Sequence, residues 1–194
     1  MYYIYDKIII MDTKIEIFET IVHKLKDWFM EENNMASIAD FNSNNDFSIL
    51  KLIKLHFFVT AINSNEDNTL INRFDFFAMP YGPVETDIYK QIKISCVFSN
   101  FSIDNFNANF TENTPNKTIS EGIINSINNS ITSIKEIDSS FINADAGSLV
   151  ELTHKWNSWR VVYDEARSNG IYSKPIPREL IKNDNKILNL ELAY

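Results

Sequence analysis

The sequence predicts a mainly α, single-domain helical bundle around one buried central helix, with at most a few short strands. Three observations support this fold class. Apolar residues recur at the 3.6-residue period of a helix in several separate segments. The segment 48–62, SILKLIKLHFFVTAI, is apolar on nearly every side, as expected for a helix at the centre of a core. The chain has only 4 glycines and 5 prolines, which is few for the many corners of a β-sandwich or barrel.

Size and charge narrow the classes of protein further. The 194 residues are 44% hydrophobic and 13% aromatic, so the chain can form a core and is not disordered throughout. With 26 acidic and 18 basic residues, the net charge is −8. This charge disfavours direct binding to nucleic acid or a membrane, because both need a cationic face, and favours a neutral or basic protein partner. The single cysteine, Cys96, cannot form an internal disulfide, which is typical of the reducing cytoplasm.

The first residues, MYYIYDKIII, are apolar but contain Asp6 and Lys7 and are too short to span a bilayer. They also lack the basic region and cleavage site of a signal peptide. We treat 1–11 as an N-terminal extension, with an extended strand as one conformation that its composition allows. One domain is expected over 12–194, because no repeat or change of composition divides it.

The elements of the first half follow from periodicity and capping. A helix is predicted from Asp12 to Phe29, where apolar residues form one stripe. A polar loop then leads to the central helix, which Ser48 is expected to cap. The segment 70–80, LINRFDFFAMP, fits a helix, although its Phe-rich end also fits an extended chain.

The turn Tyr-Gly-Pro-Val at 81–84 predicts the start of another helix. Gly82 can adopt backbone angles that other residues resist, and Pro83 suits the first helical position. Glu85 and Asp87 would then lie in the first turn, where negative charge complements the helix dipole. The free amides of such a helix start could instead bind an anion, but these two carboxylates argue against it.

The second half predicts one long loop and four helices. The loop, rich in Phe and Asn, covers 95–117 and has room for one short strand. The helices are indicated by apolar spacing and by boundary residues such as Asn169-Gly170 and Pro177, and they cover 119–142, 148–154, 158–170 and 176–188.

The chain offers no recognisable catalytic or metal-binding pattern. The histidines His23, His56 and His154 have no second His or Cys at a zinc-ligand spacing. Cys96 is expected to be a small hydrophobic residue rather than a nucleophile. No phosphate-binding loop, dinucleotide fingerprint or Gly-x-Ser-x-Gly motif is present. We therefore expect no cofactor, no metal and no enzymatic activity, with an unrecognised enzyme as an alternative.

The segment 152–160, LTHKWNSWR, allows two interpretations. In the first, it is a bend between two helices, where Trp159 packs inward and His154 caps the preceding helix. In the second, its aromatic residues contact another protein, since Trp and Tyr are preferred at interfaces.

Three segments stand out in order along the chain: LKLIKLHFF (50–58), FFAMPYGPVETDIY (76–89) and LVELTHKWNSW (149–159). In order and spacing they resemble the Panacea domain, which is the SocA-like, antitoxin-associated family of bacteria and their phages. The resemblance extends over roughly 15–190. The residues that match the family motifs are Lys51, Leu52, Lys54, Leu55, Phe58, Ala78, Tyr81, Gly82, Pro83, Val84, Tyr89, Leu152, Thr153, His154 and Trp159.

The resemblance implies an antitoxin-type protein that neutralises a partner toxin by direct binding, or that presents the toxin to a protease as an adaptor. It also implies no catalysis. The alternative is a phage- or prophage-associated protein of the same fold that binds a host protein. Four residues could contact the partner, because their spacing does not require them in the core: Tyr81, Tyr89, Trp156 and Arg160.

Overall fold

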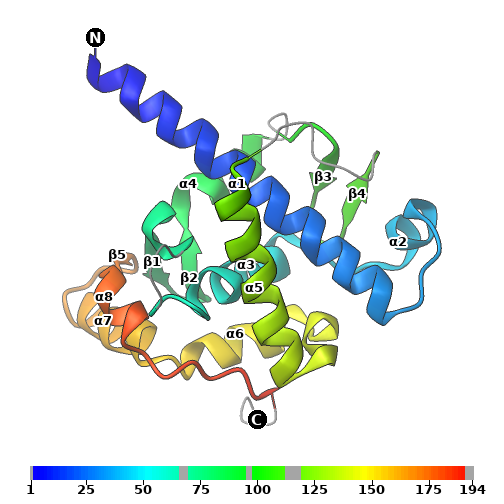
Figure 1. Cartoon of the computed structure of the whole chain (residues 1–194). Helices are drawn as coiled ribbons and strands as arrows, with labels where there is room; N and C mark the ends of the chain where they lie inside the picture. The colour runs from blue at the N-terminus through cyan, green and yellow to red at the C-terminus, as the bar shows by residue number, and fades with distance from the viewer. Residues whose placement is uncertain (1, 66–69, 95–97, 112–118, 191–194) are drawn as a thin grey trace.

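Helices surround a central helix, α3, a small three-stranded antiparallel sheet packs against it, and a two-stranded hairpin lies nearer to α2 (Figure 1). The computed structural model describes residues 2–65, 70–94, 98–111 and 119–190, with side chains from residue 14 onward. The helices are α1 (Tyr2–Glu32), α2 (Ile38–Asn44), α3 (Ile49–Ala61), α4 (Thr86–Ile94), α5 (Glu121–Ile137), α6 (Ala146–His154), α7 (Asn157–Ser168) and α8 (Arg178–Lys182), with 3₁₀ turns η1 (Leu70–Arg73) and η2 (Ser139–Asn143). The prediction of a mainly α fold with few strands is confirmed. Among the described residues, no helix combines the length and apolar character needed to cross a membrane.

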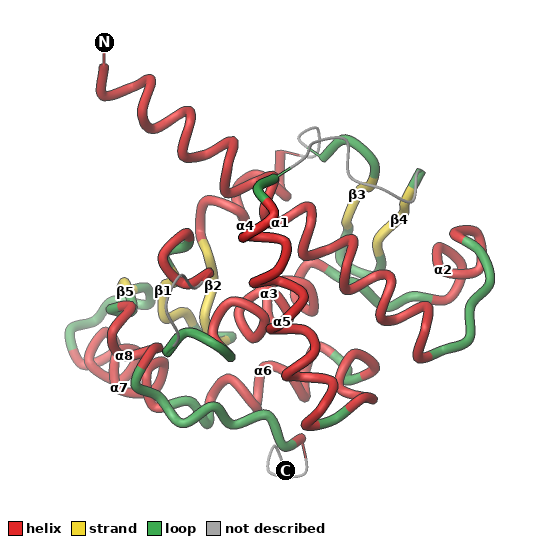
Figure 2. The backbone as a smooth tube through the Cα atoms, viewed as in Figure 1, coloured by secondary structure: helices red, strands yellow, loops and turns green. Residues whose placement is uncertain are grey.

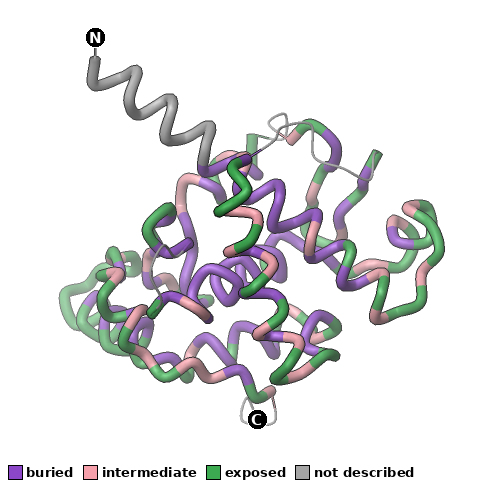
Figure 3. The backbone as a smooth tube through the Cα atoms, viewed as in Figure 1, coloured by how far each residue is buried: buried purple, intermediate pink, exposed green. Residues whose placement is uncertain are grey.

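The central helix α3 is confirmed as the most buried of the described helices. Ser48 caps it, because its Oγ accepts a hydrogen bond from the Lys51 amide at 3.2 Å. Every residue of α3 except Leu50 is buried, and the helix is coloured almost entirely as buried in Figure 3. A helix buried all round needs apolar residues on every face, which is what the sequence of α3 provides.

The larger sheet has three short antiparallel strands in the order β2 (Gly82–Glu85), β1 (Phe76–Met79) and β5 (Lys174–Pro175) (Figure 2). Met79 pairs with Gly82, so the β1–β2 turn consists of Pro80 and Tyr81. The segment 70–80 therefore contains both conformations that its sequence allowed, since η1 precedes the strand. Strand β5 pairs with β1 from about a hundred residues further along the chain.

The prediction that 81–84 begins a helix is wrong. Gly82 lies in strand β2, and α4 begins at Thr86. Glu85 precedes the helix and caps it, because its Oε2 accepts a hydrogen bond from the Ile88 amide at 2.7 Å. The anion-binding alternative assumed that the free amides of a helix start lie at 82–85, and it loses this basis because these residues form a strand. The expectation of unusual backbone angles at Gly82 is confirmed by its φ of 90°.

The extended-strand alternative for the first residues is also wrong, because residues 2–11 are part of α1. Adding a residue to an existing helix forms a new backbone hydrogen bond, whereas no described strand pairs with this segment. Residue 1 lies outside the described residues. The assignment of 1–11 as a separate extension stays a prediction.

The Phe- and Asn-rich segment 95–117 is only partly described. Residues 98–111 contain a hairpin of β3 (Phe101–Ile103) and β4 (Ala108–Phe110), so the expected short strand is joined by a second one. The side-chain amides of Asn42 and Asn45, from and just after α2, hydrogen-bond the backbone of β4 at Phe110 and Ala108. The rest of the segment, with Cys96, lies outside the described residues.

Candidate functional site

The three motif segments meet at one place in the fold. Helix α3 packs against strand β2 and helix α6, β2 packs against α6, and α7 packs against β1. The meeting point is the β1–β2 turn. We call the turn backbone at 79–83, together with the side chains of Lys54, Thr153, His154 and Trp159, the turn site.

The Lys54 side chain extends from α3 to Pro83, at the end of the turn where β2 begins. Its side chain is fully buried, and its Nζ donates a hydrogen bond to the Pro83 carbonyl at 2.8 Å. Within the part of the chain that the structure describes, no carboxylate forms an ion pair with it. Burial disfavours the charged ammonium and lowers the pKa of Lys54 to about 7. The single hydrogen bond to the Pro83 carbonyl is small compensation for the desolvation of a buried amine, so a role beyond packing is needed to explain Lys54.

Gly82 lies in contact with Thr153 of α6. A Cβ atom at position 82 would overlap Thr153 Oγ1 and would lie 3.0 Å from Lys54 Nζ. The Thr153 hydroxyl is itself fixed, because it donates to the Val150 carbonyl at 2.7 Å. Position 82 therefore requires glycine for two independent reasons, the positive φ and the close approach of Thr153.

Trp159 and His154 hold the other side of the turn. Trp159 Nε1 donates to the Met79 carbonyl at 2.9 Å. The His154 ring stacks on Trp159 with centroids 4.0 Å apart, and its imidazole interacts with the Pro80 carbonyl. Burial lowers the pKa of His154, and Glu151 and the Pro80 carbonyl oppose that shift only in part. His154 is the last residue of α6, but the cap is Lys155, whose amide donates to the Leu152 and Thr153 carbonyls, so the expectation that His154 caps this helix is wrong.

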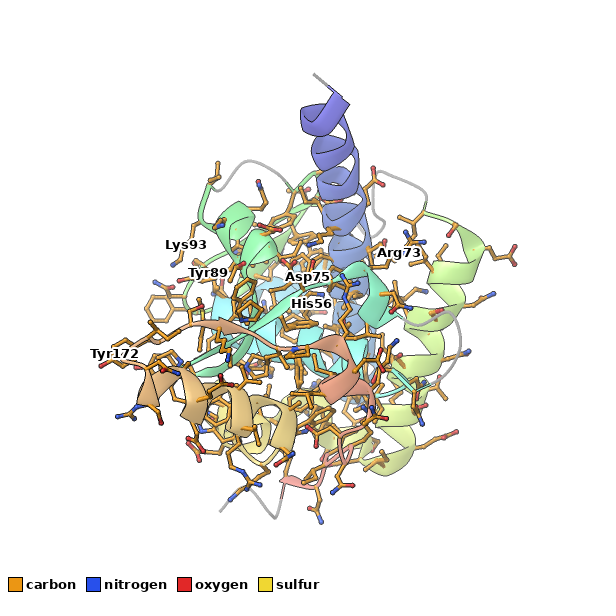
Figure 4. All side chains as sticks on the ribbon, turned by 90° about the vertical axis from the view of Figure 1, so that its left-hand side faces the viewer. His56, Arg73, Asp75, Tyr89, Lys93 and Tyr172 are labelled. Carbon is orange, nitrogen blue, oxygen red and sulfur yellow. The ribbon has the colours of Figure 1, made fainter. Side chains whose placement is uncertain are left out.

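The four residues expected at a partner surface differ in exposure. Tyr81, at the tip of the turn, is 68% exposed and is the most accessible of the tyrosines in the described chain. Tyr89 lies on α4 and is partly exposed, with the Lys93 ammonium 5.5 Å from its ring centroid (Figure 4). Arg160 is exposed at the start of α7 and donates to Asn157.

The expectation that Trp156 lies at a surface is wrong. Its side chain is fully buried, and its Nε1 donates to the Ile187 carbonyl at 2.9 Å. The ring packs edge-on against Phe57 and Phe58 of α3. The bend between α6 and α7 points this residue toward the central helix, so Trp156 contributes to the core rather than to a binding surface. The inward packing expected of Trp159 is confirmed.

The other motif residues belong to the core. Lys51 is fully buried, pairs with Asp46 at 2.6 Å and lies over the rings of Phe29 and Phe47. Burial lowers the pKa of Lys51, although Asp46 and Asp145 oppose this shift. The apolar motif residues are also buried: Leu52, Leu55, Phe58, Ala78, Val84 and Leu152.

Sequence reasoning missed a second polar cluster at the other end of β2. Lys14 of α1 reaches Glu85 at 2.8 Å and both Asp75 and Asp87 at 3.4 Å. Burial lowers the pKa of Lys14, but the hydrogen bond to Glu85 and the three carboxylate charges outweigh it, so the net pKa is raised. These residues lie more than sixty positions apart from Lys14 in the sequence, so no local spacing could reveal the cluster.

His56 lies beside this cluster, close to Asp75 in Figure 4, and packs among aromatic rings. Its ring meets those of Phe18, Phe74 and Phe76 at centroid distances of 4.4 to 5.4 Å. Neither ring nitrogen has a hydrogen-bond partner, and burial, with a smaller effect of the Lys14 charge, lowers the pKa of His56 to about 3. His56 is therefore a neutral core residue. Across the described ranges, no three His, Cys, Asp or Glu side chains are placed to hold a metal.

The fold and the turn site define a class of protein: a mainly helical domain in which a short β-turn is held between a central helix and a late helix pair. The family model described as antitoxin SocA-like, Panacea domain matches residues 52–160, which are 109 of the 194 residues, and the chain belongs to this family. The match includes every residue of the turn site. No curated protein and no solved structure matches the chain. Family membership supports a role associated with toxin–antitoxin systems, and thus a protein partner.

Proposed function

We propose that this protein is an antitoxin that neutralises a toxin by forming a stoichiometric complex with it. The observation that carries the proposal is the family match over 52–160. The matched parts of the three motif segments meet at the β1–β2 turn, whose tip residue Tyr81 is exposed. The net charge of −8 favours a toxin with a neutral or basic contact face. We place this complex in the cytoplasm.

Binding rather than catalysis is supported by how the polar groups of the turn site are used. The Lys54 amine and the Trp159 indole both donate to backbone carbonyls of the turn. Such donors fix a backbone conformation, and a fixed surface is what recognition of a folded partner requires. A catalytic site would instead direct such groups toward a substrate.

Co-expression with the product of the neighbouring gene tests the proposal. If that product is the toxin, its expression alone should stop growth, and expression of both proteins should restore growth and yield a complex that copurifies. Rescue that persists while no complex forms would contradict direct neutralisation.

If the protein is instead an adaptor that presents the toxin to a protease, a different result is expected. An adaptor should shorten the lifetime of the toxin, because it presents the toxin to a protease. The toxin half-life should then fall in the presence of this protein only in cells that contain the protease. An unchanged half-life with full rescue would leave direct binding alone as the mechanism.

A further inference from the structure

We propose that the β1–β2 turn is the docking loop for the partner toxin and that Tyr81 is its anchor, held in place by Lys54, His154 and Trp159 as positioning residues. This inference rests on the proposed function and adds the contact surface.

Surface turns are usually the mobile parts of a fold, but this one is held from both sides. Trp159 Nε1 bonds the Met79 carbonyl at 2.9 Å, and Lys54 Nζ bonds the Pro83 carbonyl at 2.8 Å. The His154 imidazole interacts with the Pro80 carbonyl between them. Gly82 is closed off by Thr153, so the backbone cannot move inward. The turn is therefore ordered before any partner arrives, which lowers the entropy lost on binding.

The use of a lysine at position 54 supports a role beyond folding. An apolar side chain of similar length would fill the same buried volume without the desolvation of an amine. Lys54 forms one hydrogen bond there and no ion pair within the described chain. The hydrogen bond from the lysine fixes the orientation of the Pro83 carbonyl, and the fixed backbone in turn sets the direction of the Tyr81 side chain.

Tyr81 is the side chain that this arrangement exposes. It is 68% exposed, whereas the next residue, Gly82, is buried. Tyrosine is enriched among the residues that dominate binding energy, because its ring buries a large area at a small loss of conformational entropy. A well-held turn with an exposed tyrosine at its tip has the form of an interface anchor.

Further exposed apolar residues lie next to the turn. Strand β5 pairs antiparallel with β1 through Ala78 and Lys174, so the residues just before β5 run toward the end of β1 that leads into the turn. These residues are Ile171 and Tyr172, which are 46% and 65% exposed. The occupant we assign to this surface is the toxin, because the family match supports a protein partner and the net charge of the whole chain, −8, favours one that carries basic groups. The toxin face would hold an apolar pocket for the Tyr81 ring.

The test measures toxin binding and folding stability in the same set of variants. The probe is the purified toxin encoded by the neighbouring gene, and its Kd is measured by calorimetry against wild type, Tyr81→Ala, Tyr81→Phe and Lys54→Met. Phe106→Ala is the matched control, because Phe106 is 78% exposed on the β3–β4 hairpin, away from the turn in Figure 1.

Tyr81→Ala should raise Kd at least about thirty-fold while the Tm stays within about 2 °C of wild type. Tyr81→Phe should retain most of the affinity, and Phe106→Ala should bind as wild type does. Lys54→Met should raise Kd about tenfold, with faster hydrogen exchange at the turn amides and unchanged exchange in α3. That local change separates a positioning role from a purely structural one.

Two results would overturn the inference alone. The first is wild-type affinity in Tyr81→Ala while the wild-type complex forms normally. The second is an equal loss of affinity in Phe106→Ala, which would place the contact elsewhere or spread it over the surface. Failure of the wild-type protein to bind the toxin would instead overturn the proposed function, and this inference with it.

Discussion

Replacement of Gly82 by alanine tests the construction of the turn site most sharply. The variant adds one methyl group at a residue whose φ is 90°, a conformation that residues with a Cβ rarely adopt. The new Cβ would overlap Thr153 Oγ1 and would lie 3.2 Å from Thr153 Cβ. Backbone strain of this kind costs about 1–2 kcal/mol, and overpacking costs about 1–3 kcal/mol. We therefore expect a total destabilisation of about 2–5 kcal/mol.

The assay is thermal and urea unfolding followed by circular dichroism at constant protein concentration. For a chain of this size, 2–5 kcal/mol corresponds to a decrease in Tm of about 5–15 °C. The double variant Gly82→Ala/Thr153→Ala separates the two causes, because it removes the overlapping hydroxyl but not the strain at φ. We expect the double variant to be more stable than the sum of the single variants predicts, by about 1–3 kcal/mol. Wild-type stability of Gly82→Ala, or strict additivity in the double variant, would refute the contact with Thr153.

Three further perturbations test the core and its buried ionisable groups. Phe58→Ala should destabilise the fold by about 3–5 kcal/mol, because Phe58 is fully buried against Phe141 and Trp156; a normal Tm would remove α3 from the core. The pKa of His56 is lowered to about 3 in the fold, so below pH 6.5 the unfolded chain binds a proton at His56 that the folded chain does not. Wild type should therefore lose up to about 1.4 kcal/mol of stability per pH unit from pH 6.5 toward 3. Urea unfolding at each pH should show that His56→Leu lacks this loss. The pKa of Lys54 is lowered to about 7 in the fold, so the cost of burying its charge is complete below pH 7 and is relieved as the pH rises toward 10.5. The free energy of unfolding of wild type should therefore rise over this range relative to that of Lys54→Met. Parallel plots of unfolding free energy against pH for the two proteins would show that Lys54 is not desolvated.

The elements that sequence reasoning located correctly are those whose signal is local. Helix α3 is apolar on every face and has a serine at its cap, and neither property depends on distant residues. The boundary of α7 at Asn169-Gly170 is also local, because Gly170 adopts a positive φ directly after the helix.

The features that sequence reasoning missed depend on pairing across the chain. Gly82 and Pro83 were expected to begin a helix, but β1 and β2 pair across the turn and β5 completes the sheet from far along the chain. Strand formation is decided by such neighbours more than by intrinsic preference. Trp156 was expected at a surface for the same reason, since only the packing of α3 against the α6–α7 bend shows that it is buried.

The candidate site likewise combines features with a local sequence signal and features that depend on contacts between distant segments. Its motif residues could be identified one segment at a time, but their roles could not. That Lys54, from α3, bonds the carbonyl of Pro83 follows only from the packing of α3 against β2. The exposure of Tyr81 likewise becomes informative only when the residues that hold its backbone are known.

The central claim is that this protein acts by binding a toxin in a fixed ratio, and a titration of toxin activity tests it most directly. Increasing amounts of the purified protein are added to a fixed, micromolar amount of the purified toxin from the neighbouring gene, with and without EDTA. Residual toxin activity should fall linearly to zero at a whole-number molar ratio, at which size-exclusion chromatography shows a single complex, and EDTA should change nothing. Complete loss of toxin activity at a small fraction of that ratio, without a complex, would mean turnover and would rule out neutralisation by stoichiometric binding.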